Sequence, residues 1–340
     1  MKVKRLVFPR AWQAEWVDIE VSDSPAADEV LVESSATMIN YGTLVAIYTG
    51  THININNPDV AWPKFPHLPA SNTVGTVRAV GNSVRNLRVG DRVCFNGPFA
   101  RFHMLDTTSR ELLKVPDPVT DVQGAVAAHS TISLNGIRLG SVTLGTSVGI
   151  FGQGVIGQYA LQYAKLAGAT LVAAIEPVRQ RAEISKACGA DVTINPSEAD
   201  VEGEIASITG GKGLDVVIEA TGNPAVIPTA LKIAGWRGRV VLLGSPRGRI
   251  EIDPYNDIHR KGVVVVGAHA QTAPELENSY YPWTTERNTL VAWQLVAQGR
   301  LQLERLVSHR LPAAEGHTVF DRLARQRDEF LGVVLDWRNA

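Results

Sequence analysis

The stretch that decides the fold of this 340-residue chain reads Val148-Gly149-Ile150-Phe151-Gly152-Gln153-Gly154-Val155-Ile156-Gly157. An apolar run leads into three glycines spaced Gly-x-Gly-x-x-Gly, and a helical run follows them. Gly152 allows a sharp turn out of a strand, Gly154 leaves room for a pyrophosphate, and Gly157 lets the helix pack closely on the sheet. The first N–H groups of that helix, near Val155 and Ile156, would face the phosphates. The stretch therefore predicts a dinucleotide-binding turn.

An acidic residue follows this turn where dinucleotide-binding folds hold the ribose. Glu176 ends the second apolar run, 19 residues after Gly157. A carboxylate there accepts hydrogen bonds from the ribose hydroxyls and repels a 2′-phosphate, so NAD(H) is expected in preference to NADP(H). Arg179 and Arg181 lie close by in the sequence. They could partly offset that preference, or they could be solvated charges on the following helix.

Two patterns along the chain predict two kinds of domain. Up to about Pro118 the apolar segments are short, β-rich and separated by turn residues, which favours a small barrel or sandwich. From about Ala127 to Ala270 strands and helices alternate, with helices expected to end at Gly189 and Gly235. The strands are almost continuously apolar, as in a parallel sheet covered on both faces. These expected strands are Val148–Phe151, Leu171–Ile175, Asp215–Glu219, Arg239–Leu243 and Val263–Val266.

Composition excludes several functional classes. The formal net charge of −1 gives no electrostatic footprint for nucleic acid or an anionic membrane, so neither is expected as a partner. The two cysteines, Cys94 and Cys188, cannot form a disulfide framework or a four-cysteine zinc site. The apolar run at the start ends at Pro9, too early for a signal peptide, and no stretch approaches the roughly 20 apolar residues of a membrane span. The expected location is the cytoplasm.

The order of a β-rich domain, a nucleotide-binding domain and a return to the first domain resembles the medium-chain dehydrogenase/reductase family. The resemblance covers nearly the whole chain. It implies a GroES-like β-barrel catalytic domain at 1–126, a Rossmann NAD(P)-binding domain with a doubly wound parallel sheet at 127–270, and a return to the catalytic domain at 271–340. The motifs that carry it are Gly81-x-x-Val84-x-x-Leu87-x-x-Gly90-Asp91-Arg92-Val93, Ala187-Cys188-Gly189-Ala190-Asp191, Asp215–Gly222, Gly238–Gly244 and Val307-Ser308-His309-Arg310.

Zinc-dependent members of this family hold a catalytic metal whose ligands are missing here. Tyr41 stands at the first ligand position, Ser71 at the histidine position and Ala127 at the third. The family's relay histidine is Ala46, and the structural-zinc loop retains only Cys94. We therefore expect no metal at either site. Alternative ligands could in principle come from three histidines whose spacing matches no zinc pattern: His52, His103 and His129.

Without zinc, hydrogen-bond donors must serve the reacting oxygen. The resemblance implies that Thr43 contacts this oxygen and relays its proton, and that Thr131 packs on the nicotinamide. Tyr41 could donate to a carbonyl oxygen or could simply fill the emptied volume. His52 lies near the position where zinc-free enoyl reductases of the family carry a tyrosine acid, or it is a solvated loop histidine. His129 either faces the active-site cleft or caps a helix.

Backbone contacts are expected to complete the nicotinamide side. Thr221 would close the fourth strand over the cofactor, and the remaining expected contacts are Gly244, Ser245, Gly267 and Ala268. Two polar-aromatic stretches, Tyr255–Arg260 and Tyr280–Thr285, would line the substrate or form a dimer or interdomain contact. Such a lining suits a polyhydroxylated or heterocyclic ligand.

These features predict a zinc-independent NAD(P)(H)-dependent oxidoreductase that interconverts an alcohol and a ketone or aldehyde on a small polar or cyclic substrate. One alternative is an enoyl- or quinone-type reductase of a conjugated C=C bond; another is a catalytically inactive nucleotide-binding member of the family. The Tyr41-Gly42-Thr43 spacing resembles alcohol dehydrogenases more than the Asn-Pro-x-Asp pattern of quinone reductases, whereas Asn40 fits either. The family's usual homodimer would pair edge strands at about Val263–Gly267, because an unpaired apolar edge is a liability.

Overall fold

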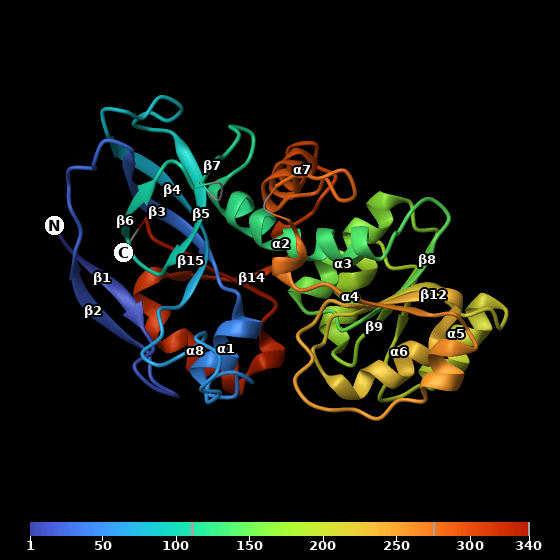
Figure 1. The fold of residues 1–340 in the computed structure, drawn as a ribbon. Coiled ribbons are helices and arrows are strands. Elements are labelled where there is room, and N and C mark those ends of the chain that lie inside the picture. Colours follow the sequence, from blue (N-terminus) through green and yellow to red (C-terminus); the bar gives the residue numbers. More distant parts are fainter. Residues whose placement is uncertain (110–111, 275, 339–340) are drawn as a thin grey trace. The chain divides into compact units, whose positions relative to one another are not determined.

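The computed structural model describes residues 1–109, 112–274 and 276–338 (Figure 1). The chain divides into two compact units. Unit 1 consists of Met1–His129, Thr289–Gln298 and Val307–Ala340, and unit 2 consists of Ser130–Asn288 and Gly299–Leu306. Within the described ranges, every helix is too short or too polar to cross a membrane.

Unit 2 is built on a six-stranded sheet in which all neighbouring strands are parallel. The strand order is β10-β9-β8-β11-β12-β13, so the direction of winding reverses between β8 and β11. This is the doubly wound Rossmann arrangement that the sequence predicts. The strands are β8 Ser147–Phe151, β9 Leu171–Ile175, β10 Val192–Ile194, β11 Leu214–Glu219, β12 Ala234–Leu242 and β13 Val264–Gly267.

Helices pack against this sheet, and on one face α5 and α6 bury Ile205 and Leu231 against Val217 and Val240. The predicted stop at Gly235 is wrong, because α6 ends two residues earlier and Gly235 already belongs to β12. The helices of unit 2 are α3 Val155–Ala167, α4 Arg179–Ala187, α5 Val201–Thr209 and α6 Ile227–Ile233, with the short helical turns η1 Pro224–Val226, η2 Pro254–His259, η3 Ala270–Thr272 and η4 Glu304–Leu306.

Unit 1 contains a largely antiparallel seven-stranded sheet of order β14-β15-β3-β4-β5-β7, with β6 paired to β3 and a separate β1–β2 pair. Alternate residues of these strands, including Val30, Val32, Val77 and Phe95, form an apolar cluster. The β-rich first domain is therefore confirmed. Its strands are β1 Lys2–Val7, β2 Glu15–Glu20, β3 Glu29–Met38, β4 Ala70–Val80, β5 Arg92–Pro98, β6 Phe102–Asp106, β7 Leu113–Lys114, β14 Val307–Pro312 and β15 Gly332–Asp336.

Two helices of unit 1 are α1 Tyr41–Tyr48 and α8 Gly316–Arg325, and the short turns η5 Ala313–Glu315 and η6 Arg327–Glu329 flank α8. Two further helices, α2 Asp121–Leu139 and α7 Thr285–Ala297, contain residues of both units.

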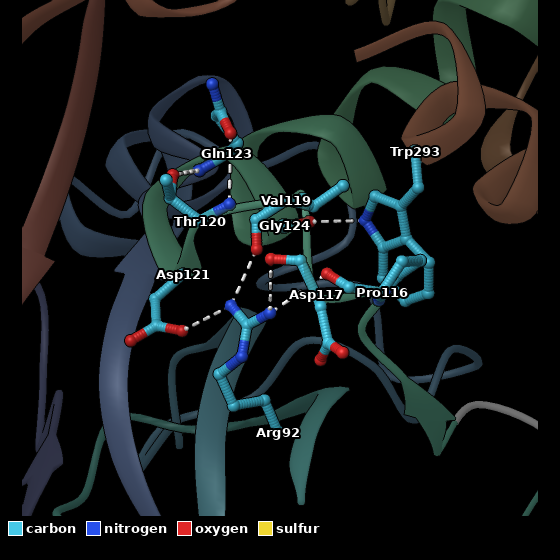
Figure 2. Close-up of polar contacts among 9 residues, drawn as sticks. All are labelled: Arg92, Pro116, Asp117, Val119, Thr120, Asp121, Gln123, Gly124 and Trp293. Carbon is cyan, nitrogen blue, oxygen red and sulfur yellow. Dashed lines mark hydrogen bonds and ion pairs between the residues drawn. The ribbon is translucent and has the colours of Figure 1, made fainter. Parts of the chain in front are cut away.

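Figure 2 shows how the first turn of α2 is fixed within unit 1. Thr120 Oγ1 accepts from Gln123 N at 3.2 Å, while Gln123 Oε1 accepts from Thr120 N at 3.0 Å. This reciprocal pair is a capping box, which satisfies N–H groups that the helix itself leaves without acceptors. Buried Trp293 donates to the Gly124 carbonyl at 3.1 Å. The Arg92 guanidinium donates to the carbonyl oxygens of Pro116, Asp117 and Val119 and to the carboxylate of Asp121.

The two units differ from the predicted domain boundaries in three places, one of which is the short stretch Gly299–Leu306, which belongs to unit 2 although the sequence places it in the returning part of the catalytic domain. Unit 1 continues to His129 rather than to residue 126, and residues 271–288 stay with unit 2 although the sequence places the return at 271. These residues are held by their own unit: Tyr281 donates to Asn135 at 2.6 Å, and Trp283 lies against two arginines of unit 2.

Candidate functional site

The turn between β8 and α3 has the geometry that the glycine spacing predicts. Gly152 has a φ of +81°, and a Cβ on it would lie 2.7 Å from Thr221 Cγ2. A Cβ on Gly157 would lie 1.8 Å from the Gly152 carbonyl oxygen, so this helix start tolerates only glycine. Gly154 caps α3, whose first residues include Val155 and Ile156. The N–H groups of a first helical turn have no acceptor within the helix, so this turn can hold an anion.

Glu176 bonds directly to this glycine turn. It follows β9 and is 4% exposed. Its Oε2 accepts from the main-chain N–H of Gln153 at 2.5 Å, and its Oε1 accepts from Val178 N at 3.0 Å. The carboxylate is therefore oriented by main-chain groups on both sides.

The two arginines near Glu176 behave differently. Arg179 is exposed and pairs with Glu183 at 3.0 Å, as expected for a solvated charge. Arg181 is only 9% exposed, so that alternative is wrong for Arg181. Its carbonyl accepts from Gln158 Nε2 at 2.9 Å, which ties α4 to α3.

Sequence reasoning missed Glu219 as a site residue, although an acid at the end of an apolar strand was a usable signal. Glu219 is fully buried at the end of β11, next to Phe151 of β8. Its Oε1 accepts from Thr221 N at 2.6 Å, from Gly222 N at 3.0 Å and from Thr221 Oγ1. Its Oε2 has no hydrogen-bond partner among the described residues, and burial raises the pKa of this carboxyl.

Glu219 also ties the loops after β11 and β12 together. Its carbonyl oxygen accepts from Leu243 N at 2.9 Å and Gly244 N at 2.6 Å. A Cβ on Gly222 would lie 2.9 Å from the Ser245 carbonyl oxygen, so the two loops touch. Ala268, after β13, donates its N–H to Leu242 O at 3.0 Å. The carboxyl ends of neighbouring strands thus bring together Gly152, Glu176, Thr221, Gly244, Ser245, Gly267 and Ala268 on one edge of the sheet.

Thr131 lies on the part of α2 that belongs to unit 2. Ser133 Oγ donates to the Ile156 carbonyl at 2.8 Å, and the hydroxyls of Ser130 and Tyr163 are 2.6 Å apart. These bonds hold α2 beside the first turn of α3. His129, in the part of α2 that belongs to unit 1, is 7% exposed, and burial lowers its pKa to about 4.

Within unit 1, α1 carries the first two candidate proton donors. Tyr41 is the first residue of the helix and is 7% exposed, while Thr43 is half-buried. The burial of Tyr41 does not separate its two predicted roles, because a buried phenol can donate a hydrogen bond as well as fill a volume.

His52 is 9% exposed, so the interpretation as a solvated loop histidine is wrong. Its Nδ1 accepts from Asn54 N at 3.3 Å, which leaves Nε2 to carry the proton of a neutral ring. The Trp62 indole lies edge-on, 5.3 Å from His52 and 6.1 Å from His67. Burial lowers the pKa of His67, with a contribution from His52. Trp62 and His67 were not predicted as neighbours of His52, because no periodic pattern in the sequence links the three rings.

The loop that carries these rings is fastened by a lysine. Lys64 Nζ donates to the carbonyl oxygens of Asn54 at 3.2 Å, Ile55 at 3.2 Å and Asn57 at 2.6 Å. The ammonium therefore occupies a ring of main-chain oxygens. This fixes the segment that follows His52.

The residues at the family's zinc-ligand positions do not suit zinc. Ser71 offers a buried neutral hydroxyl with no hydrogen-bond partner among the described residues, and Ala127 offers no donor atom. Burial raises the pKa of the Cys94 thiol to about 12, which disfavours the thiolate that a metal needs. Within residues 1–109, 112–274 and 276–338, no group of three His, Cys, Asp or Glu side chains is arranged to hold a metal ion.

Residues of the two polar-aromatic stretches differ in how far they are exposed. Tyr281 and Trp283 pack against α2 within unit 2. Tyr280 is 97% exposed. Tyr255 is 61% exposed and stacks on His259, with ring centres 5.8 Å apart.

Comparisons with known proteins agree with both units. Residues 26–167 match the family described as "Alcohol dehydrogenase GroES-like domain", and residues 155–286 match "Zinc-binding dehydrogenase". The D-guloside 3-dehydrogenase of Escherichia coli K12 is 30% identical over 237 residues, covering 69% of this chain and 67% of that protein. The L-threonine 3-dehydrogenase of Pyrococcus abyssi is 29% identical over 328 residues, covering 88% of each.

A solved structure extends the likeness to almost the whole chain. The 2R,3R-butanediol dehydrogenase of Bacillus subtilis superposes with a TM-score of 0.83 at 23% identity, covering 99% of this chain and 100% of that one. At this identity the likeness concerns the fold.

Proposed function

The chain belongs to the zinc-type medium-chain dehydrogenase/reductase family of NAD(P)-dependent oxidoreductases, and we propose that it interconverts an alcohol and a ketone or aldehyde without zinc, with NAD(H) preferred. The observation that carries the cofactor preference is the bond between Glu176 and Gln153 N. It directs a carboxylate to the glycine turn, where it would accept from ribose hydroxyls and repel a 2′-phosphate.

When bound, NAD(H) supplies or accepts the hydride. The chain's own residues bind and orient it: the first turn of α3 would hold the pyrophosphate, and the loops tied together by Glu219 would support the nicotinamide. Thr131, on α2 beside α3, would pack against the ring. Among the described residues, no group of three or more His, Cys, Asp or Glu side chains is placed to hold a metal ion.

The proton of the reacting oxygen must then be handled by groups of unit 1. Tyr41 and Thr43 lie in the first turn of α1, separated by Gly42, and offer hydroxyls that can donate to a carbonyl oxygen. His52 offers Nε2–H, because Nδ1 is used as an acceptor. We assign the main role to Thr43, with Tyr41 or His52 as its partner.

The relatives' names suggest the class of substrate. A guloside and threonine are both polar, hydroxyl-bearing molecules. We therefore propose a small polar alcohol or its ketone as the substrate.

A second candidate is reduction of a conjugated C=C bond. His52 favours it, since a buried imidazole whose Nδ1 accepts from Asn54 N is a suitable acid for protonating the carbon next to a carbonyl.

One experiment separates these candidates: NADH oxidation with matched saturated ketones and conjugated enones, with and without a chelator, and with each product identified. We expect ketones to become alcohols and the chelator to have no effect. His52→Gln should reduce enone turnover most if the second candidate is correct. Tight NADH binding without turnover on any substrate would instead support an inactive nucleotide-binding member, and loss of activity with the chelator would contradict zinc independence.

We also propose a homodimer formed through β13. This strand is at the edge of the sheet, and Val264 and Val265 are 43% and 42% exposed. Exposed β-branched side chains on an unpaired edge favour strand pairing with a second copy. Val265→Lys should convert the dimer to a monomer in sedimentation equilibrium; an unchanged mass would contradict this interface.

A further inference from the structure

The segment after β13 is fastened to α2 by one buried amide. Asn135 is 2% exposed. Its Nδ2 donates to Thr272 Oγ1 at 3.0 Å, and its Oδ1 accepts from Tyr281 OH at 2.6 Å. Thr272 Oγ1 in turn donates to the His269 carbonyl at 2.7 Å. One carboxamide thus joins two points that are nine residues apart in the segment.

Each of the hydrogen bonds that link His269, Thr272, Asn135 and Tyr281 has a fixed direction. The Thr272 hydroxyl proton is used on the His269 carbonyl, so Thr272 must accept from the Asn135 amide. Asn135 Oδ1 therefore faces the Tyr281 phenol, which must donate. Burial raises the pKa of Tyr281, which keeps that proton in place. Hydrogen bonds linked in this way, around one buried carboxamide, fix geometry more strongly than isolated bonds do.

A second contact holds the later part of the segment against the same helix. The guanidinium of Arg138 lies 3.4 Å from the centre of the Trp283 ring, and that of Arg287 lies 4.3 Å from it. Arg138 Nε also donates to Asn288 Oδ1 at 3.0 Å. Cations that lie close to the face of an indole make a favourable contact in a partly buried setting.

These contacts share one face of α2 with Thr131. Residues three or four apart on a helix are neighbours on its surface, so Thr131, Asn135 and Arg138 form one stripe. Thr131 is expected at the nicotinamide. The segment that Asn135 holds begins directly after Gly267 and Ala268, which are expected at the same ring.

We propose that Asn135 is a positioning residue for the nicotinamide: it fixes the segment that follows Gly267 and Ala268 relative to Thr131, on the same helix face. This inference rests on the proposed function of unit 2 as an NAD(H)-binding unit. Asn135 acts through the Thr272 and Tyr281 hydroxyls rather than by touching the cofactor. Its loss should therefore affect the nicotinamide and leave the adenosine and pyrophosphate contacts, at Glu176 and α3, intact.

The test compares NADH with ADP-ribose, which lacks only the nicotinamide. Asn135→Ala should weaken NADH binding by about 10-fold and change ADP-ribose binding by less than about 2-fold, measured by calorimetry on the full chain. Tyr281→Phe, which removes only the phenolic hydroxyl, should lower the ratio of NADH affinity to ADP-ribose affinity in the same direction, by a smaller factor. If Asn135→Ala fails to fold, Tyr281→Phe decides: an unchanged ratio overturns the proposal.

A matched control is Gln162, another buried amide of unit 2 that joins two segments of the chain. Gln162 on α3 donates to the Gln302 carbonyl at 3.2 Å and accepts from Gln302 N at 2.8 Å. Gln162→Ala should lower the melting temperature without changing the ratio of NADH to ADP-ribose affinity. Equal weakening of both ligands in Asn135→Ala would show a general structural role and overturn the proposal. A wild-type chain that binds neither ligand would instead contradict the proposed function.

Discussion

The buried histidines of the described chain lie in unit 1, whereas its buried glutamates lie in unit 2. The histidines are His52, His67, His103 and His129, and the glutamates are Glu176 and Glu219. Burial lowers the pKa of three of the histidines and raises that of Glu219. Unit 1 thus offers neutral rings that can give or receive a proton. Unit 2 uses carboxyl groups to hold main-chain N–H groups around an expected anionic cofactor.

The two units should therefore respond to pH in opposite directions, and the largest effect is expected in unit 1. The pKa of His103 and that of His129 are both lowered from 6.5 to about 4 by burial. The pKa of each histidine is lower in the folded chain than in the unfolded one. The stability that comes from keeping the two rings neutral is therefore complete above pH 6.5 and is lost as the pH falls towards 4. Two groups together give a slope of about 2.7 kcal/mol per pH unit in the free energy of unfolding.

Urea denaturation of unit 1 between pH 7 and 4.5, followed by tryptophan fluorescence, measures this slope. His103→Gln keeps a donor towards the Ala100 carbonyl and should halve it. A variant with the wild-type slope would mean that His103 is not held neutral.

Next in size is a substitution that breaks the glycine turn of unit 2. Gly157→Ala places a Cβ 1.8 Å from the Gly152 oxygen, so NADH affinity should fall by about 100-fold or more. Gly42→Ala is the matched change in unit 1. Gly42 lies inside α1, and a Cβ on it would meet no neighbouring atom within 4 Å. That variant should keep its NADH affinity and gain about 0.5–1 kcal/mol in stability. Normal NADH binding by Gly157→Ala would exclude this turn as the cofactor site.

A smaller effect is expected from neutralising the buried carboxylate of Glu176. Glu176→Gln should weaken the binding of NADH by about 10-fold and that of NADPH by less than about 2-fold, because only NADH has a free 2′-hydroxyl on the adenosine ribose. Glu183→Gln, which removes an exposed partner of Arg179, serves as the control and should change neither. Equal losses of both cofactors in calorimetry would remove Glu176 from the ribose contact.

The smallest effect should come from Glu219 and should run opposite to that of the histidines. Its folded pKa is raised above the unfolded value of 4.5, so the native state loses stability as the pH rises through the folded pKa. Glu219→Gln does not titrate there. Its stability relative to wild type should rise with pH above 4.5, by at most about 1.4 kcal/mol per pH unit, and then become constant. A constant difference from pH 4.5 to 8 would mean that Glu219 ionises normally.

Much of unit 2 could be predicted because its constraints are local in sequence. The left-handed φ of Gly152 and the close approach at Gly157 follow from glycine spacing, and five of the six strands follow from apolar runs. The sixth, β10, has only three residues and gives no such run.

The rest depends on contacts between distant parts of the chain. Asn135 and Tyr281 are 146 residues apart, so no local pattern could assign residues 271–288 to unit 2. The burial of His52 depends on how its loop folds back, since its ring neighbour Trp62 lies ten residues further on. Side-chain environments of this kind are set by packing, which a single sequence does not reveal.

Lys64 lies in the loop that carries His52 and Trp62. Lys64 serves as a tethered cation, bound by three main-chain oxygens as a free ion would be. Acetylation of this one amine would remove its charge and leave two of the three oxygens without a donor. A single covalent change outside the cofactor unit would then loosen the segment that holds His52 and Trp62 in place.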